Sequence, residues 1–294
     1  MSGAPSGAPN LADRRRGRKD RRHGPAERMS EASNRDAAGS QPRNGRHGRV
    51  TVRDLTVGYR ERVAVEAVSG VFVAGSLTAI VGANGAGKTT LLHAIAGLIA
   101  PRHGSIEITG AEVPADLAYL PQSDSIDRDF PISVLEFTAL GGWARIGVLG
   151  RVPMELRLHA MSALQAVGLD DLAGRMLGEL SVGQFRRALF ARVIVQDAAI
   201  VLLDEPFAGV DAATSDELLR LMQHWHGEGR TVMVALHDLD QVLAIFPATL
   251  LLARKVIAWG ETVTALTPEK LLEAGLAALP GTRARSRPAM PSSR

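Results

Sequence analysis

A glycine-rich segment at residues 82–90 constrains the fold of this chain more than any other feature of its sequence. The segment follows a short apolar run at residues 76–82 and precedes residues with helical apolar spacing. Its glycines let the backbone turn so that consecutive N–H groups point inward, where the positive end of the following helix also acts. We therefore predict a strand, a phosphate-binding loop and a helix, with the loop formed by Gly82, Ala83, Asn84, Gly85, Ala86, Gly87, Lys88, Thr89 and Thr90.

Two acidic residues complete the expected site. An apolar run at residues 200–203 is typical of a buried strand, and it ends in Asp204 and Glu205, with Asp204 116 residues after Lys88. Lys88 can reach the β- and γ-phosphates of a nucleotide, and the Thr89 hydroxyl can ligate Mg²⁺. Asp204 can hold the same ion through water, and Glu205 can act as a general base on the attacking water. These residues predict a nucleoside triphosphatase.

The remaining pattern alternates strands with helices. Residues 50–55 and 63–68 have alternating apolar positions, which predict an antiparallel hairpin or meander. Short apolar runs predict further strands at residues 105–109, 117–120, 231–236 and 249–259. Such alternation is typical of a mostly parallel α/β core, and no internal repeat interrupts it.

Several helix starts are also visible. Residues 132–179 are expected to be mostly helical, and another helix starts at Ser181 or Val182. Thr214 and Glu217 have the spacing of a capping box, which predicts a helix starting at Thr214.

Composition limits the remaining classes. The chain has 294 residues, 46% of them hydrophobic, and no cysteine, so a disulfide scaffold and a thiolate metal site are excluded. Residues 1–49 hold 12 Lys or Arg against 5 Asp or Glu, and we expect a disordered basic tail there. Residues 276–294 are expected to be a flexible basic tail. The folded body, residues 50–275, is net acidic, so specific nucleic-acid binding is not expected.

The N-terminal tail leaves alternatives open. Its basic run at residues 14–22 could rest on anionic lipid or RNA, or could simply be solvated, and Met29 is a possible alternative start. No apolar run approaches the roughly 18–20 residues that span a bilayer, so the chain itself is expected to be soluble.

Further segments resemble the ATP-binding cassette (ABC) ATPases. Leu180-Ser181-Val182-Gly183-Gln184 lies about 20 residues before Asp204, as the signature of that family does. Single residues that match other family motifs are Gln122 in LPQ, Asp211 in AGVD, His237 in ALHD and Tyr59 in VGYR. Because their order and spacing both match, the chain is identified as a member of this family over residues 50–275.

The resemblance implies a fold and a set of roles. The fold would be a RecA-like core with an antiparallel β region and a helical subdomain at about residues 132–185. ATP would bind with Mg²⁺, with adenine stacked on Tyr59. Gln122 would ligate Mg²⁺ beside Thr89 and Asp204, while His237 would hold the γ-phosphate and the attacking water for Glu205.

The family also implies a head-to-tail homodimer in which each hydrolytic site is shared. Ser181, Gly183 and Gln184 of one cassette would close over the γ-phosphate bound by the other, with Asp211 at the same interface. Val182 departs from the family pattern, where glycine is commonest. A β-branched residue would be strained there if its φ were positive, so we expect slower turnover than with glycine.

Other segments resemble one branch of the family, the importers of zinc and manganese. Residues 120–131 and 207–214 carry this resemblance, and the C-terminal half is most similar to ATPase subunits of zinc importers. The resemblance implies a separate membrane permease, a site at the cytoplasmic face of the membrane, and an indirect partnership with an extracytoplasmic metal-binding protein. Asp127–Phe130 are the expected permease contacts.

Two alternatives stay open at this point. The cargo could be manganese or an iron chelate, or the chain could be a soluble ABC ATPase acting on nucleic acid or ribosomes, which only the basic tail favours. The histidines do not point to bound cargo: His224 and His226 are two residues apart on an expected helix and face different directions, and His93 stands alone. We therefore expect His93 to be structural.

Overall fold

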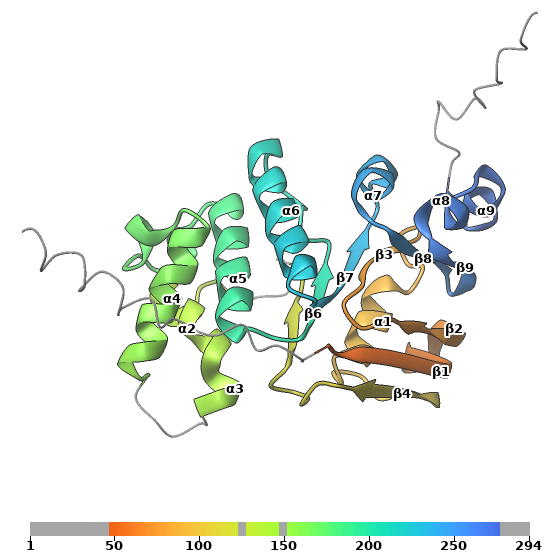
Figure 1. Ribbon diagram of the computed structural model, residues 1–294, viewed down its shortest axis with the longest axis horizontal. Helices are drawn as coiled ribbons and strands as arrows, with labels where there is room; N and C mark the ends of the chain where they lie inside the picture. The colour runs from red at the N-terminus through yellow and green to blue at the C-terminus, as the bar shows by residue number, and fades with distance from the viewer. Residues whose placement is uncertain (1–46, 123–127, 147–151, 277–294) are drawn as a thin grey trace, which may run out of the picture. The chain divides into compact units, whose positions relative to one another are not determined.

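The computed structural model describes residues 47–122, 128–146 and 152–276 (Figure 1). Three antiparallel strands form a small sheet in the order β2-β1-β4. They are β1 (Arg49–Tyr59), β2 (Arg62–Phe72) and β4 (His103–Thr109). The predicted hairpin is confirmed, because β1 and β2 pair antiparallel from Val50 and Phe72 to Tyr59 and Arg62. Alternate residues of β1, among them Val50 and Val52, are buried on one face of this sheet.

A second sheet of six strands has the order β5-β6-β7-β3-β8-β9. All neighbouring pairs are parallel except β8 and β9. The strands are β3 (Leu77–Val81), β5 (Leu117–Leu120), β6 (Ile200–Asp204), β7 (Thr231–Leu236), β8 (Ala248–Ala253) and β9 (Lys255–Glu261). Every residue of β3, β6 and β7 is buried, as their continuous apolar sequences predict for strands covered on both faces. The mostly parallel α/β core is therefore confirmed.

Helices and the small sheet cover opposite faces of this core. Ile200 and Leu202 of β6 pack with α1 (Lys88–Ile95) and the antiparallel sheet, whereas Val201 and Leu203 pack with helices on the other face. Figure 1 shows α5, α6 and α7 on that second face. The helices after β6 are α6 (Ala212–Gly227), α7 (Leu239–Ile245), α8 (Thr262–Ala265) and α9 (Pro268–Glu273).

Between β5 and β6 the described chain forms helices and short turns. The helices are α2 (Val134–Ala139), α3 (Trp143–Ile146), α4 (Met154–Ala166) and α5 (Val182–Gln196), with 3₁₀ turns at Leu140–Gly142, Asp170–Leu172 and Leu177–Glu179. Ser133 and Glu136 form a capping box at the start of α2. Apolar side chains such as Phe137, Leu164 and Phe185 join these helices to the main core.

The start of α6 differs from the prediction. Asp211, not Thr214, is the N-cap residue, and its carboxylate accepts hydrogen bonds from the Thr214 N–H and the Thr214 hydroxyl, both at 2.9 Å. The proposed box of Thr214 with Glu217 is therefore wrong. Asp is as good an N-cap as Thr, and starting at Asp211 adds one helical turn of good helix formers.

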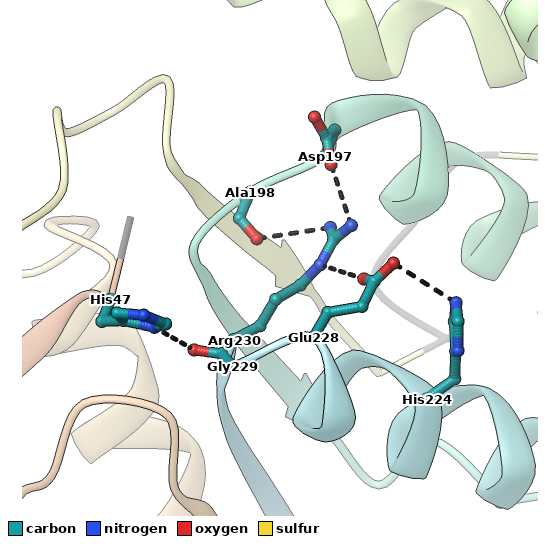
Figure 2. A network of polar contacts seen from close by, with 7 residues as sticks. All are labelled: His47, Asp197, Ala198, His224, Glu228, Gly229 and Arg230. Atoms are coloured by element: carbon teal, nitrogen blue, oxygen red, sulfur yellow. Dashed lines mark hydrogen bonds and ion pairs between the residues drawn. The ribbon is translucent and has the colours of Figure 1, made fainter. Parts of the chain in front are cut away.

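A network of hydrogen bonds and ion pairs lies at the edge of the sheet where β6 and β7 begin (Figure 2). Arg230 bonds to Asp197 and Glu228, both at 2.8 Å, and the His47 Nδ1 atom lies 2.9 Å from the Gly229 carbonyl. His224 contacts Glu228. The Gly48 carbonyl accepts a hydrogen bond from the Thr231 hydroxyl, so contacts with the core are made by residues slightly before Val50.

His226 bonds elsewhere, to the Gly75 carbonyl at 2.8 Å, so His224 and His226 have different partners. Among the described helices, none combines the length and apolar composition needed to cross a membrane. The predicted tails fall almost entirely on residues 1–46 and 277–294, which lie outside the described residues.

Candidate functional site

The site forms where the parallel strands β3, β6 and β7 end. The loop after β3 leads into α1, Asp204 is the last residue of β6, and His237 directly follows β7. Because β3 and β6 both pair with β7 in parallel, their carboxyl ends meet at one edge of the sheet. This edge is the usual ligand position in open α/β sheets. It is opposite to the edge that carries the Arg230 network.

The loop between β3 and α1 folds around its own lysine. Lys88 is only 6% exposed, and its Nζ atom donates to the carbonyl oxygens of Gly82 at 2.8 Å and Ala83 at 3.3 Å. Burial lowers the pKa of Lys88, while the negative charges of Glu205 and Asp204 oppose that shift. The ammonium group is thus held at the loop with two acids nearby.

Gly87 shows why this loop needs glycine at the helix start. Its φ is 102°, in the left-handed region, and a Cβ atom there would lie 2.5 Å from the Ala64 carbonyl oxygen of β2. Gly87 is the N-cap of α1 and supplies no side-chain cap. The amides of the first turn of α1 are therefore left without a side-chain acceptor, as a phosphate-binding helix start requires.

Asp204 is a buried carboxylate close to Thr89, Lys88 and Tyr119 but without a hydrogen bond of good geometry to the described residues. It is 0% exposed, and within the described parts of the chain neither of its oxygen atoms makes a hydrogen bond. Burial raises the pKa of Asp204 and the charge of Glu205 adds to the rise, whereas the Thr89 side chain and the charges of His93 and Lys88 lower the pKa. An unpaired buried carboxylate is costly, and a bound cation would compensate it. The oxygen donors of Asp204 and Thr89 are of the type that Mg²⁺ prefers.

Glu205 adopts a backbone conformation that is unusual for its residue type. Its φ is 47°, in the left-handed region, and its N–H donates to the Ala235 carbonyl of β7 at 3.1 Å. This conformation costs about 1–2 kcal/mol in a residue with a Cβ atom, and such strain is concentrated at functional sites. The strained turn brings Glu205 to the lining of two adjoining pockets.

The first pocket, of about 520 Å³, gathers half of the predicted residues. They are Tyr59, Asn84, Gly85, Gly87, Lys88, Thr89, Thr90, Gln122 and Glu205. A second pocket of about 390 Å³ is lined by Gly82, Ala83, Asn84, Glu205, His237 and Leu276. Ala86 lines neither pocket, because its N–H bonds to the Ala83 carbonyl and its own carbonyl accepts the Arg254 N–H. Glu205 is thus placed between the phosphate loop and His237.

Besides Ala86 and the buried Asp204, four predicted residues line neither pocket: Ser181, Gly183, Gln184 and Asp211. Ser181 is the N-cap of α5, and its hydroxyl accepts the Gln184 N–H at 3.2 Å while the Gln184 Oε1 atom accepts the Ser181 N–H at 2.9 Å. Hydrogen bonds from Thr214 hold the pKa of Asp211 below its usual value. Within one copy of the chain, these residues support helix starts and do not line the pocket.

The expectation of backbone strain at Val182 is wrong. Val182 is the first residue of α5, and it is not among the residues with positive φ. A valine at the first helical position keeps an ordinary backbone, so strain gives no reason for slow turnover. Its side chain is exposed and faces Gly209, where an added Cβ atom would lie 3.1 Å from the Val182 Cγ1 atom.

Sequence reasoning missed four residues of the first pocket: Arg62, Val63, Ala64 and Arg254. The first three follow the β1–β2 turn. Arg254 lies at the β8–β9 turn with a φ of 62°, its N–H bonded to Ala86 and its carbonyl bonded to the Glu66 N–H. No local pattern brings these turns to the phosphate loop. Of the expected permease contacts, Phe130 is exposed, and Asp127 lies outside the described residues.

Comparison with known proteins agrees with this geometry. The sequence profile described as ABC transporter matches residues 65–208. The chain is 37% identical to the manganese transport system ATP-binding protein MntB of Listeria monocytogenes over 225 residues, covering 75% of this chain and 93% of that protein. The chain belongs to the ABC transporter ATPase family. This ABC ATPase is also 39% identical to the zinc transport system ATP-binding protein TroB of Treponema pallidum, covering 75% of this chain and 84% of TroB.

Solved structures agree on the fold of the ABC ATPase. A structure described as a metal-chelate type ABC transporter, in an inward-facing conformation, matches with a TM-score of 0.69 at 30% identity. The match covers 78% of this chain and 89% of that one. The predicted family, the α/β cassette fold and the ATP-hydrolysing activity are therefore confirmed.

Proposed function

We propose that this ABC ATPase energises the import of a divalent transition metal, and that zinc is its cargo. The observation that carries the ATPase part is the phosphate loop facing the unpaired carboxylate of Asp204 and the strained turn at Glu205. The metal cargo is supported by the names of the relatives, which include both manganese and zinc systems. The similarity of the C-terminal half to zinc-importer subunits favours zinc over manganese.

In the proposed site, the phosphates of ATP lie on the loop and the first turn of α1, with Lys88 at the β- and γ-phosphates. The adenine stacks on Tyr59 at the far end of the same pocket. Glu205 accepts a proton from the attacking water, and His237 holds the water and the γ-phosphate. The position of Glu205 in both pockets supports this arrangement.

Thr89, Gln122 and Asp204 are the proposed holders of Mg²⁺. A bound Mg²⁺ would neutralise charge on the β- and γ-phosphates. Thr89 and Gln122 line the pocket, and Asp204 lies beneath it with no hydrogen bond to its oxygen atoms from the described residues. The oxygen donors of these three residues fit the preference of the ion.

The active form is proposed to be a homodimer of cassettes. Ser181, Gly183 and Gln184 of one copy would close over the γ-phosphate held by the other, with Asp211 at the same interface. Ser181 and Asp211 are exposed, Gly183 and Gln184 are partly exposed, and none of them lines the two pockets of its own chain, which supports this arrangement. We place the dimer on the cytoplasmic face of the cell membrane beneath a separate permease, with an extracytoplasmic metal-binding protein as an indirect partner.

The experiment is a measurement of cellular metal content by mass spectrometry in a strain that lacks this chain, grown under zinc limitation. The strain is complemented with the wild type or with Glu205→Gln, which keeps the loop but removes the proposed base. We expect cellular zinc alone to fall in the deletion strain and to be restored only by the wild type.

Other outcomes would contradict separate parts of the proposal. A fall of manganese or iron in place of zinc reassigns the cargo and leaves the ATPase site intact. Restoration by Glu205→Gln would contradict the need for hydrolysis. Unchanged zinc, manganese and iron in the deletion strain, with no second importer induced, would overturn metal import itself.

A further inference from the structure

Tyr59 is tied to a histidine outside the pocket. Tyr59 is the last residue of β1, is 49% exposed and lines the first pocket. Its hydroxyl lies 3.0 Å from the Nδ1 atom of His93, which is on α1 five residues after Lys88. His93 itself does not line the pocket. We expected His93 to be only structural, but it directly contacts a residue that lines the pocket.

A second aromatic residue holds the imidazole of His93 in place. The ring of Tyr119 on β5 meets it edge to face, with ring centres 5.5 Å apart and an angle of 85° between the planes. Such an edge-on contact favours one ring orientation over others. Burial lowers the pKa of His93, although the charge of Asp204 opposes the shift. At neutral pH a neutral imidazole can accept the hydrogen bond from the Tyr59 hydroxyl.

The need for this contact follows from the place of Tyr59 in the hairpin. The next residue, Arg60, has a φ of 49° and starts the turn into β2, so Tyr59 stands at the exposed end of a strand pair. A half-exposed tyrosine at such a position can occupy several χ1 rotamers. A hydrogen bond at the far end of its ring selects one of them before any ligand arrives, which reduces the ordering cost of binding.

We propose that His93 is a positioning residue for the nucleotide base, holding the Tyr59 ring in the orientation on which adenine stacks. The inference rests on the proposed stacking of adenine on Tyr59 and adds the residue that orients it. His93 forms its hydrogen bond with Tyr59, and with the described residues of the phosphate loop it forms none, so without Mg²⁺ its effect is expected on ligands that carry a base. This restriction separates positioning of the base from general support of α1.

The test measures equilibrium binding of ATP to the full-length chain, and of inorganic tripolyphosphate, which has the phosphates but no base. For His93→Ala we expect the Kd for ATP to rise about three- to tenfold, as for loss of one hydrogen bond, with the Kd for tripolyphosphate unchanged. His93→Gln retains a polar end and should recover most of the ATP affinity. His103→Ala is the matched control, because His103 contacts Asp54 and does not line the pocket.

Tyr59→Phe keeps the ring and removes the hydroxyl, so it should match His93→Ala, and the double variant should bind ATP no more weakly than either single variant. Equal weakening of ATP and tripolyphosphate in His93→Ala would overturn the inference, because His93 would then support the loop itself. An unchanged Kd for ATP in His93→Ala, beside a weakened one in Tyr59→Ala, would overturn the inference and keep the stacking on Tyr59. An unchanged Kd for ATP in Tyr59→Ala would overturn both the stacking of adenine on Tyr59 and the positioning role of His93.

Discussion

The N-terminus of α1 and the N-terminus of α5 use their backbone amides in different ways. At α1, Gly87 provides no side-chain cap, and the loop before it lines a pocket with Lys88. At α5, Ser181 and Gln184 cap each other, and neither lines a pocket of the same chain. The first helix start leaves its donors for a ligand, whereas at the second start side chains of the same helix accept hydrogen bonds from two of the amides.

The difference shows how one chain can hold two unequal halves of a site. We call the phosphate loop, residues 82–90, with Asp204 and Glu205 the α1 half, and residues 181–184 at the start of α5 the α5 half. The α1 half is completed by groups of the same chain, since Asp204 and Glu205 both act electrostatically on Lys88. The α5 half remains stable while exposed because its capping box satisfies two amides without a ligand. The Ser181 hydroxyl accepts one hydrogen bond and can still donate its own proton. It can therefore cap α5 and bind a phosphate oxygen at the same time.

The largest expected effect comes from Glu205, which belongs to the α1 half. Glu205→Gln should lower steady-state ATP turnover by about 100-fold or more, because the general base is lost. ATP binding should persist, since Lys88 and the loop are unchanged, and the closed dimer should accumulate with ATP. Steady-state phosphate release and size-exclusion chromatography with ATP measure both effects. Multiple turnovers at the wild-type rate would remove Glu205 from this role.

Asp204 tests whether the α1 half carries an electrostatic strain that its ligand relieves. Asp204→Asn should raise the free energy of unfolding of the ligand-free protein by about 1–3 kcal/mol, because an unpaired buried charge is removed. It should also reduce the extra stabilisation that Mg²⁺ adds to that given by ATP, because Asp204 is a proposed holder of the ion. Thermal unfolding with and without Mg²⁺ and ATP measures both changes.

The pH dependence of that gain follows from the sign of the shift. Burial raises the pKa of Asp204 above its ordinary value of 3.8, so the folded protein binds this proton more readily than the unfolded chain. The associated stability is fully present below that ordinary value and is lost as the pH rises through the raised pKa. The advantage of Asn over Asp should therefore shrink as the pH falls. An advantage that grows on acidification would contradict the assignment.

Ser181 tests the α5 half. Ser181→Ala removes the N-cap acceptor and should cost about 1 kcal/mol in the free energy of unfolding. Turnover should fall about tenfold, because the hydroxyl can no longer donate to phosphate across the dimer. ATP binding by the monomer should not change, since Ser181 lines neither pocket. Weaker ATP binding by the monomer would place Ser181 at its own chain's pocket and break the comparison between the two halves.

Much of the α1 half could be predicted from local sequence, because its signals are contiguous. The apolar run into β3, the glycines of residues 82–90 and the acids after β6 each specify a strand end or a loop without reference to the rest of the chain. The φ of 47° at Glu205 could not be predicted, because no glycine marks it. It occurs together with a hydrogen bond from the Glu205 N–H to the Ala235 carbonyl of β7, a contact that depends on the pairing of β6 with β7.

Contacts between turns that are distant in the sequence could not be predicted either, because no local pattern indicates them. The Arg254 N–H reaches Ala86 across more than half the chain, and it lies there only because β8 pairs with β3. The bond between Tyr59 and His93 likewise needs the β1–β2 hairpin to close over α1. At α6, two good capping residues three positions apart competed, and local propensity did not rank Asp211 above Thr214.

Substitution of Val182 has the smallest expected effect on turnover, and it tests the backbone conformation at the start of α5. Because Val182 is in ordinary helical backbone at the start of α5, replacing it by glycine relieves no strain. Val182→Gly should leave ATP turnover within about twofold of the wild type and should lower the free energy of unfolding by only about 0.3–0.5 kcal/mol, because glycine is a somewhat poorer helix former than valine. Val182→Ala is the matched control, since it removes the exposed side chain beside Gly209 without adding the backbone freedom of glycine. A severalfold rise in turnover for Val182→Gly but not for Val182→Ala would mean that the signature backbone must leave its helical conformation when two copies close over ATP.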